Sequence, residues 1–113
     1  MKTSGYYELR CAVVEMFYEV LQADKSAVGQ AAGRCLVEFR GEARSGGREA
    51  LVVLSVLLAR VARHDPSALK RFEPEVGALR ALSRKSSSWG NLTSSEKERM
   101  QEDVRYVLEK AAT

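Results

Sequence analysis

The chain has 113 residues, with 18 Lys and Arg against 15 Asp and Glu, and a formal net charge of +3. Its 45% apolar and 29% charged residues are typical of a folded protein and argue against disorder. The longest apolar run, residues 50–62, is interrupted by Ser55 and Arg60 and is shorter than the roughly 20 residues a membrane span needs. The length predicts a single domain, residues 1–113. No apolar stretch of signal-peptide length follows Met1, so we expect the chain in the cytoplasm.

The first helix is predicted over residues 6–23, because apolar residues recur there at the three- and four-residue spacing of one helix face. That face consists of Leu9, Val13, Met16, Phe17 and Val20. Glu8, Glu15 and Glu19 line another face, so we expect this helix to present an acidic stripe to solvent.

A second helix is predicted over about residues 25–40. Its small residues Gly29 and Gly33 indicate that another helix crosses it closely, at some cost in helix propensity. Cys11 and Cys35 both fall on helical patterns with apolar neighbours. Free cysteines behave as small hydrophobic residues, so we expect both to be buried, reduced thiols.

Residues 41–47 contain two adjacent glycines and predict a turn. Residues 48–63 then form a helix that is apolar around most of its circumference, which places it among the other helices rather than at the surface. A strand over part of this run is the alternative, because valine favours strands. The run lacks strict alternation and no second strand is available to pair with it, so the helix is preferred.

The segment after His64 restarts a helix, because Asp65 is a good N-cap and Pro66 fits the first helical position. Pro74 disfavours helical geometry in the residue before it. We therefore expect a short helix, then a second piece over about residues 75–84, unless the two form one kinked helix.

Thr93 and Glu96 match a capping box, in which each side chain satisfies the other's free backbone N–H. The last helix is predicted to run from there to about Ala111. Together the elements predict an all-α fold: a compact bundle of five to six helices packed around the central apolar helix at about residues 48–63.

The chain has little catalytic or metal-binding potential in its sequence. His64 is the single histidine, and its place at a helix end suits a cation near a helix C-terminus. No C-x-x-C, H-E-x-x-H or glycine-rich phosphate loop occurs. We therefore predict a protein that is not an enzyme and has no catalytic residues, metal site or cofactor.

Residues 25–91 carry twelve basic and six acidic side chains, while both ends of the chain are slightly acidic. A basic middle favours an acidic partner surface, or nucleic acid if the charges gather on one face. A helix-turn-helix could be built from residues 48–63 and the following segment. Its short second helix would offer only Lys70 and Arg71 for contacts with nucleic acid.

Trp89 is the single tryptophan and lies in a polar, serine-rich stretch between basic residues. Trp and Arg often dominate binding energy at protein interfaces. The predicted partner-binding surface is therefore Trp89 with Arg80, Arg84 and Lys85. Arg44 and Arg48 form a second candidate patch. The alternative for Trp89 is a ring that folds back on the core and shields the start of the last helix.

These patterns favour a protein-binding, inhibitory module. The leading hypothesis is an immunity-type protein that neutralises a cognate bacterial toxin or effector by direct binding. The net positive charge favours a target with an acidic groove over a nuclease, although the acidic first helix supports the opposite case. The alternatives are a small nucleic-acid-binding regulator and an adaptor or chaperone. The oligomeric state is left open.

Overall fold

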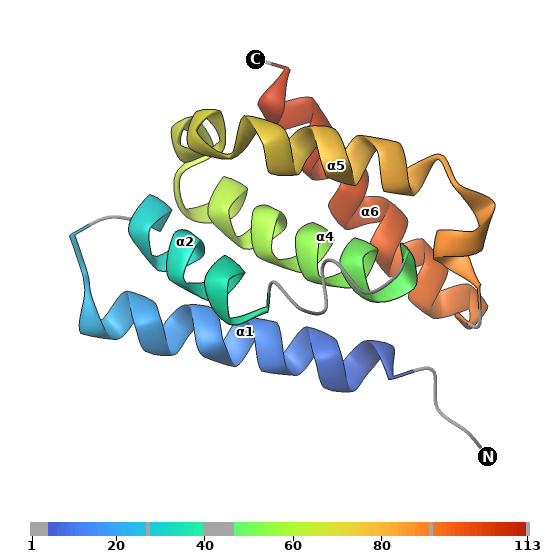
Figure 1. Cartoon of the computed structure of the whole chain (residues 1–113), viewed down its shortest axis with the longest axis horizontal. Coiled ribbons are helices and arrows are strands. Elements are labelled where there is room, and N and C mark those ends of the chain that lie inside the picture. Colours follow the sequence, from blue (N-terminus) through green and yellow to red (C-terminus); the bar gives the residue numbers. More distant parts are fainter. Residues whose placement is uncertain (1–4, 27, 40–46, 91, 113) are drawn as a thin grey trace.

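The computed structural model describes residues 5–26, 28–39, 47–90 and 92–112, and each regular element within these ranges is helical. In chain order the elements are α1 (Tyr6–Ala23), α2 (Val28–Glu38), α4 (Gly47–His64), the 3-10 helix η1 (Pro66–Phe72), α5 (Glu73–Ser83), the 3-10 helix η2 (Ser86–Trp89) and α6 (Ser94–Ala111). This arrangement confirms the predicted all-α bundle (Figure 1).

The central place predicted for residues 48–63 is also confirmed. α4 contacts α1, α2, α5, α6 and both 3-10 helices (Figure 1). Each residue from Ala50 to Ala59 is buried, so these turns of the helix have no side facing solvent. Ser55 is the polar exception, and its hydroxyl donates a hydrogen bond to the Val52 carbonyl at 3.1 Å. An apolar helix of this kind is stable in water only because its neighbours cover it on all sides.

α1 packs on α4 through an apolar stripe that includes Tyr6, Val13 and Phe17. The helix begins after Gly5, whose φ of 78° lies in the left-handed region that glycine adopts without strain.

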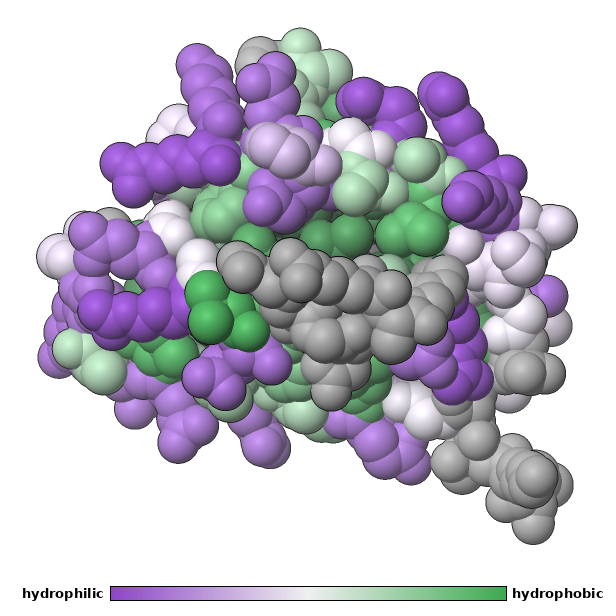
Figure 2. All heavy atoms as spheres, viewed as in Figure 1, coloured by the Kyte–Doolittle hydropathy of each residue, from purple (hydrophilic) through white to green (hydrophobic). Residues whose placement is uncertain are grey.

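Seen from the side used in Figure 1, hydrophilic side chains project around the outline of the molecule, with apolar atoms between them (Figure 2). On this face, hydrophilic side chains therefore surround the outer edge of the apolar core.

α2 is shorter than predicted, ending at Glu38 within the described residues, and it buries Ala31, Ala32 and Cys35. The expected close helix crossing is only partly found. A Cβ on Gly29 would lie 3.2 Å from the side chain of Arg71, which comes from η1, whereas a Cβ on Gly33 would meet no atom of the described residues within 4 Å. The small side of α2 thus packs closely at Gly29, where it admits the Arg71 side chain, and at the fully buried Ala32, but not at Gly33 among the described residues.

The chain between α4 and α5 starts as predicted, because the Asp65 carboxylate accepts a hydrogen bond from the Ser67 backbone N–H at 3.2 Å. The element that follows is a 3-10 helix, however, and it buries Ala68, Leu69 and Phe72. α5 begins at Glu73 with a proline in its first turn. Glu73 has helical dihedral angles, so the expectation that Pro74 keeps it out of a helix is wrong. The two pieces meet without a gap, and the break between them is at Phe72, whose φ is −115° and ψ is 32°. The second of them starts two residues earlier than predicted.

The capping box that starts α6 is confirmed. The Thr93 hydroxyl accepts the Glu96 backbone N–H at 3.2 Å, and the Glu96 carboxylate accepts the Thr93 backbone N–H at 2.9 Å. α6 then buries Met100, Val104 and Val107 in the core that surrounds α4. The helix thereby lies against α4 on the side away from α2 (Figure 1).

Candidate functional site

Trp89 is neither fully exposed nor fully buried. It ends the 3-10 helix η2, and its indole N–H donates a hydrogen bond to the Ser83 carbonyl at 2.9 Å. The ring packs against the edge of the hydrophobic core. A buried tryptophan N–H usually finds such a partner, and here the bond fixes the orientation of the ring. The ring therefore packs on the core as the alternative expects, while part of it stays exposed, and its role in binding a partner stays a prediction.

The exposed part of Trp89 lines an open groove of about 1090 Å³ between η2 and α6. Val104 and Leu108 of α6 provide further apolar lining. Lys97 and Arg105 also line the groove, and both are exposed. The groove thus combines apolar side chains with cations at positions held by one helix and an anchored aromatic ring.

None of the basic residues predicted to act with Trp89 lines the groove that contains its ring. Arg84 and Lys85 are exposed in the connection between α5 and η2. Arg80 lines a different groove, of about 670 Å³, together with Lys70 and with residues near the end of α6. Arg84 and Lys85 precede Trp89 by five and four residues in the sequence, whereas Arg80 lines the other groove.

Of the two residues in the second predicted patch, Arg44 and Arg48, the structure describes Arg48. Arg48 is half-buried, and its guanidinium group forms an ion pair with the Glu49 carboxylate at 2.8 Å. The hydrogen bond from Arg48 lowers the pKa of Glu49. Arg44 lies outside the described residues. Because its charge is matched by the adjacent glutamate, Arg48 is less suited to a partner's carboxylate than a free cation would be.

The helix-turn-helix arrangement considered from the sequence is not present. Its second helix would be η1, which is a seven-residue 3-10 helix with three buried side chains. Lys70 and Arg71 are exposed on it, and Arg71 also packs against Gly29. A recognition helix must project far enough to enter the major groove of DNA. η1 is too short and too closely packed to do so.

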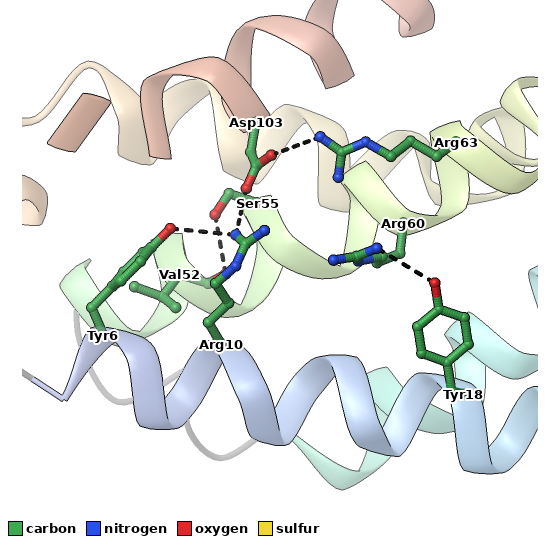
Figure 3. A network of polar contacts seen from close by, with 8 residues as sticks. All are labelled: Tyr6, Arg10, Tyr18, Val52, Ser55, Arg60, Arg63 and Asp103. Carbon is green, nitrogen blue, oxygen red and sulfur yellow. Dashed lines mark hydrogen bonds and ion pairs between the residues drawn. The ribbon is translucent and has the colours of Figure 1, made fainter. Parts of the chain in front are cut away.

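The most connected polar cluster was not predicted (Figure 3). Asp103 of α6 is buried between two arginines from different helices. Its Oδ2 accepts from Arg10 of α1 at 2.8 Å, and its Oδ1 accepts from Arg63 of α4 at 3.2 Å. Arg10 also donates to the Tyr6 hydroxyl at 3.3 Å. The cluster thus joins α1, α4 and α6.

Burial decides the electrostatics of this cluster. Arg10 and Asp103 have side chains only 9% and 3% exposed. Burial alone would lower the pKa of Arg10, but the hydrogen bond and charge of Asp103 outweigh it and the pKa is raised. Burial also raises the pKa of Tyr6, which keeps that hydroxyl neutral. The carboxylate already binds two guanidinium groups, an arrangement that suits fixing helices together rather than proton transfer.

The sequence did contain a signal for this cluster. Arg10 stands four residues after Tyr6 and three before Val13, on the buried stripe of α1. Asp103 stands three residues after Met100 and four before Val107, on the buried stripe of α6. Glu96, the other buried charge of α6, belongs to the capping box. An arginine within one apolar stripe and an aspartate within another form the pattern of a buried ion pair.

Two aromatic contacts extend the cluster along α4. The Arg60 guanidinium donates to the Tyr18 hydroxyl at 3.4 Å and lies 5.9 Å from the centre of that ring. Arg63 lies 5.3 Å from the centre of the Tyr106 ring. Such contacts hold arginine side chains in place, and each contributes about 0.5–1 kcal/mol.

The expectation of two buried cysteines is half wrong. Cys35 is buried, but Cys11 is exposed on α1. Cys11 stands one residue after Arg10, and one residue along a helix is a turn of about 100°, which carries the side chain away from the core. Among the described residues, no three His, Cys, Asp or Glu side chains gather in a way that could hold a metal ion.

None of the helices in the described part of the chain is both long and apolar enough to cross a membrane. No protein-family model matches the chain, and no curated protein or solved structure is detectably similar to it.

Proposed function

We propose that this chain is a non-enzymatic protein-binding module that inhibits its partner, in the manner of an immunity protein that neutralises a bacterial toxin or effector. The groove between η2 and α6 carries this proposal. It places an oriented tryptophan beside the apolar side chains of Val104 and Leu108. Grooves of this composition suit a protruding apolar side chain from a partner protein.

The fixed position of Trp89 is important for affinity. Its hydrogen bond to Ser83 and its packing on the core order the ring before any partner arrives. Ordering a side chain on binding costs about 0.5–1.5 kcal/mol, so a ring that is already ordered avoids this loss. A pre-ordered aromatic ring in an apolar groove is a suitable anchor for an inhibitory complex.

The charges around the groove indicate the chemistry of the partner. Lys97 and Arg105 line it, and Arg84 and Lys85 are exposed nearby along the chain. One acidic residue, Glu109, opposes them within the lining. The excess of cations favours a partner segment that carries carboxylates beside its apolar side chain, since complementary charges speed association and exclude wrong partners.

The experiment uses two arginines of the same helix. Arg105 lines the groove, whereas Arg99 is exposed on α6 and does not belong to the groove lining. The tagged wild-type chain and the variants Arg105→Glu and Arg99→Glu are each expressed in the source cells and recovered under identical conditions. We expect one dominant protein with the wild type and with Arg99→Glu, and at least about tenfold less of it with Arg105→Glu.

Inhibition is tested on the protein recovered. Cells that produce this protein should lose viability or a measurable activity, and co-expression of the wild type or Arg99→Glu should restore it. Arg105→Glu should restore it poorly. Recovery that is equal for all three chains would contradict the groove as the contact surface. Recovery of nucleic acid in place of a dominant protein would contradict the inhibitor proposal itself.

A further inference from the structure

α1 has an outward face of unusual composition. The helix runs along one border of the bundle, with no other helix beyond it (Figure 1). Tyr7 and Tyr18 are two of the three large apolar side chains that are exposed among the described residues, at 47% and 37%. They are eleven residues apart, which is about three helical turns, so they lie on the same side of α1.

Both tyrosines are held in place by contacts with buried or neighbouring groups. The Tyr7 ring packs edge-on against Tyr6, with ring centres 5.1 Å apart. Tyr18 packs edge-on against Phe17 at 5.7 Å, and Arg60 of α4 donates to its hydroxyl (Figure 3). Ordered, partly exposed tyrosines lose little conformational entropy when a partner covers them.

The charged side chains that α1 exposes to solvent are all negative. Glu8, Glu15 and Glu19 are exposed, and none of them forms an ion pair with another described residue. The one basic residue of α1 is Arg10, and it is buried against Asp103. The tyrosines therefore stand beside carboxylates whose charge is not matched within the described part of the chain.

We infer that this outward face of α1, defined by Tyr7, Cys11, Tyr18, Glu8, Glu15 and Glu19, is a docking surface for a cationic protein surface that also carries apolar groups. Aromatic side chains provide contact area, and the glutamates select basic partners by complementary charge. This face lies outside the groove of the proposed function, because no residue of α1 lines that groove.

The charge of the face argues against three other occupants. Phosphate groups of nucleic acid and anionic lipid headgroups would be repelled by the glutamates. A symmetric contact with a second copy would place the glutamates of α1 against those of another α1. An unsymmetrical contact with a second copy would repeat from copy to copy and build a ring or a filament, which sedimentation would detect.

The probe is a fluorescein-labelled amphipathic helical peptide of lysine and leucine, followed by fluorescence anisotropy. The test variant is Glu15→Lys on α1, and the matched control is Glu98→Lys, which reverses an exposed glutamate on α6. Both variants have the same net charge. We expect Glu15→Lys and Tyr7→Ser to weaken binding by about tenfold and Glu98→Lys to leave it close to that of the wild type. Circular dichroism spectra identical to the wild type establish that each variant is folded.

Two further measurements locate the site. A bulky maleimide should attach to Cys11 alone, because Cys35 is buried. Since Cys11 lies on the proposed face, the attached group should block binding of the peptide. Arg105→Glu, which tests the groove, should leave peptide binding unchanged, so failure of one surface is distinguished from failure of the other.

Three results would overturn the inference. The first is an equal loss of peptide binding in Glu15→Lys and Glu98→Lys, which would mean that only the net charge of the chain affects the affinity. The second is equal binding of a peptide in which serine replaces every leucine, which would remove any role for the tyrosines. The third is self-association of the chain in sedimentation equilibrium that Glu15→Lys abolishes, which would make the occupant a second copy.

Discussion

Arg10 and Asp103 are 93 residues apart in the chain and form a buried ion pair of 2.8 Å. The pair joins the first helix of the fold to the last, and Arg63 of α4 completes it on the other carboxylate oxygen. Burying two charges carries a large desolvation cost, which is offset only when partners and geometry are good. The register of α1 against α6 is therefore tied to this contact.

The first prediction concerns the stability that depends on this pair. Arg10→Ala leaves the Asp103 carboxylate buried with only the more exposed Arg63 as a partner, whose side chain is 42% exposed. Removal of one member of a buried pair costs about 3–5 kcal/mol, so the free energy of unfolding in urea should fall by about that amount. Arg63→Ala is the matched control and should cost about 0–1 kcal/mol, as exposed pairs do.

The double variant Arg10→Met with Asp103→Leu tests whether the loss of stability comes from the unpaired buried charge. Apolar residues of similar size can replace a buried pair at little cost, so much of the lost stability should return. Equal losses of unfolding free energy for Arg10→Ala and Arg63→Ala would show that the buried pair stabilises the fold no more than the exposed one.

The second prediction is that the two thiols differ in reactivity. Cys11 is exposed, whereas Cys35 is completely covered. A chromogenic disulfide reagent should modify one thiol per folded chain rapidly, and the second only after guanidinium chloride unfolds it. Cys11→Ser should abolish the rapid phase and retain the slow one. Two equally fast thiols in the folded wild type would contradict the burial of Cys35.

The third prediction follows from the raised pKa of Cys35. Burial raises it to about 11, from an ordinary value of 9.0. Between these values the folded chain keeps a proton that the unfolded chain loses, so the unfolding free energy falls as the pH rises from about 9 to 11. The loss is at most about 3 kcal/mol. Below pH 9 this contribution is fully present.

Cys35→Ala should flatten this part of the stability curve, measured by urea unfolding at several pH values. The raised pKa of Tyr6 acts with the same sign, so Tyr6→Phe provides an independent correction. An identical pH slope in the wild type and Cys35→Ala would contradict the prediction.

The fourth prediction concerns the environment of Trp89. Its ring is half-buried and its N–H is bonded to the Ser83 carbonyl. We expect fluorescence emission between the values of buried and fully solvated tryptophan, with partial quenching by acrylamide. Trp89→Phe removes the hydrogen bond and should lower the unfolding free energy by about 1 kcal/mol or more, because the Ser83 carbonyl loses a partner. Emission identical to that of the unfolded chain would mean that the ring does not pack on the core.

Much of the fold could be predicted from the sequence because its causes are local. The helix periodicity of residues 6–23, the nearly continuous apolar surface of residues 48–63 and the Thr93–Glu96 capping box all appear in the structure. Each depends on residues three or four positions apart, the range of a helical hydrogen bond. The 3-10 geometry of residues 66–72 was missed, because packing of that short segment decides its geometry.

The candidate site was predicted less well, because its causes are not local. The sequence by itself determined where the α-helices lie to within a few residues and that residues 48–63 lie at the centre. Only the tertiary structure decided that Arg10 pairs with Asp103, that Cys11 faces solvent while Cys35 is buried, and that Trp89 and Arg80 line different grooves. The physical reason is that burying a hydrophobic stripe requires only some apolar surface against it, so the stripe can be recognised from the sequence. Which side chain lies opposite a given residue depends on how segments distant in the chain pack together, and the sequence does not show this.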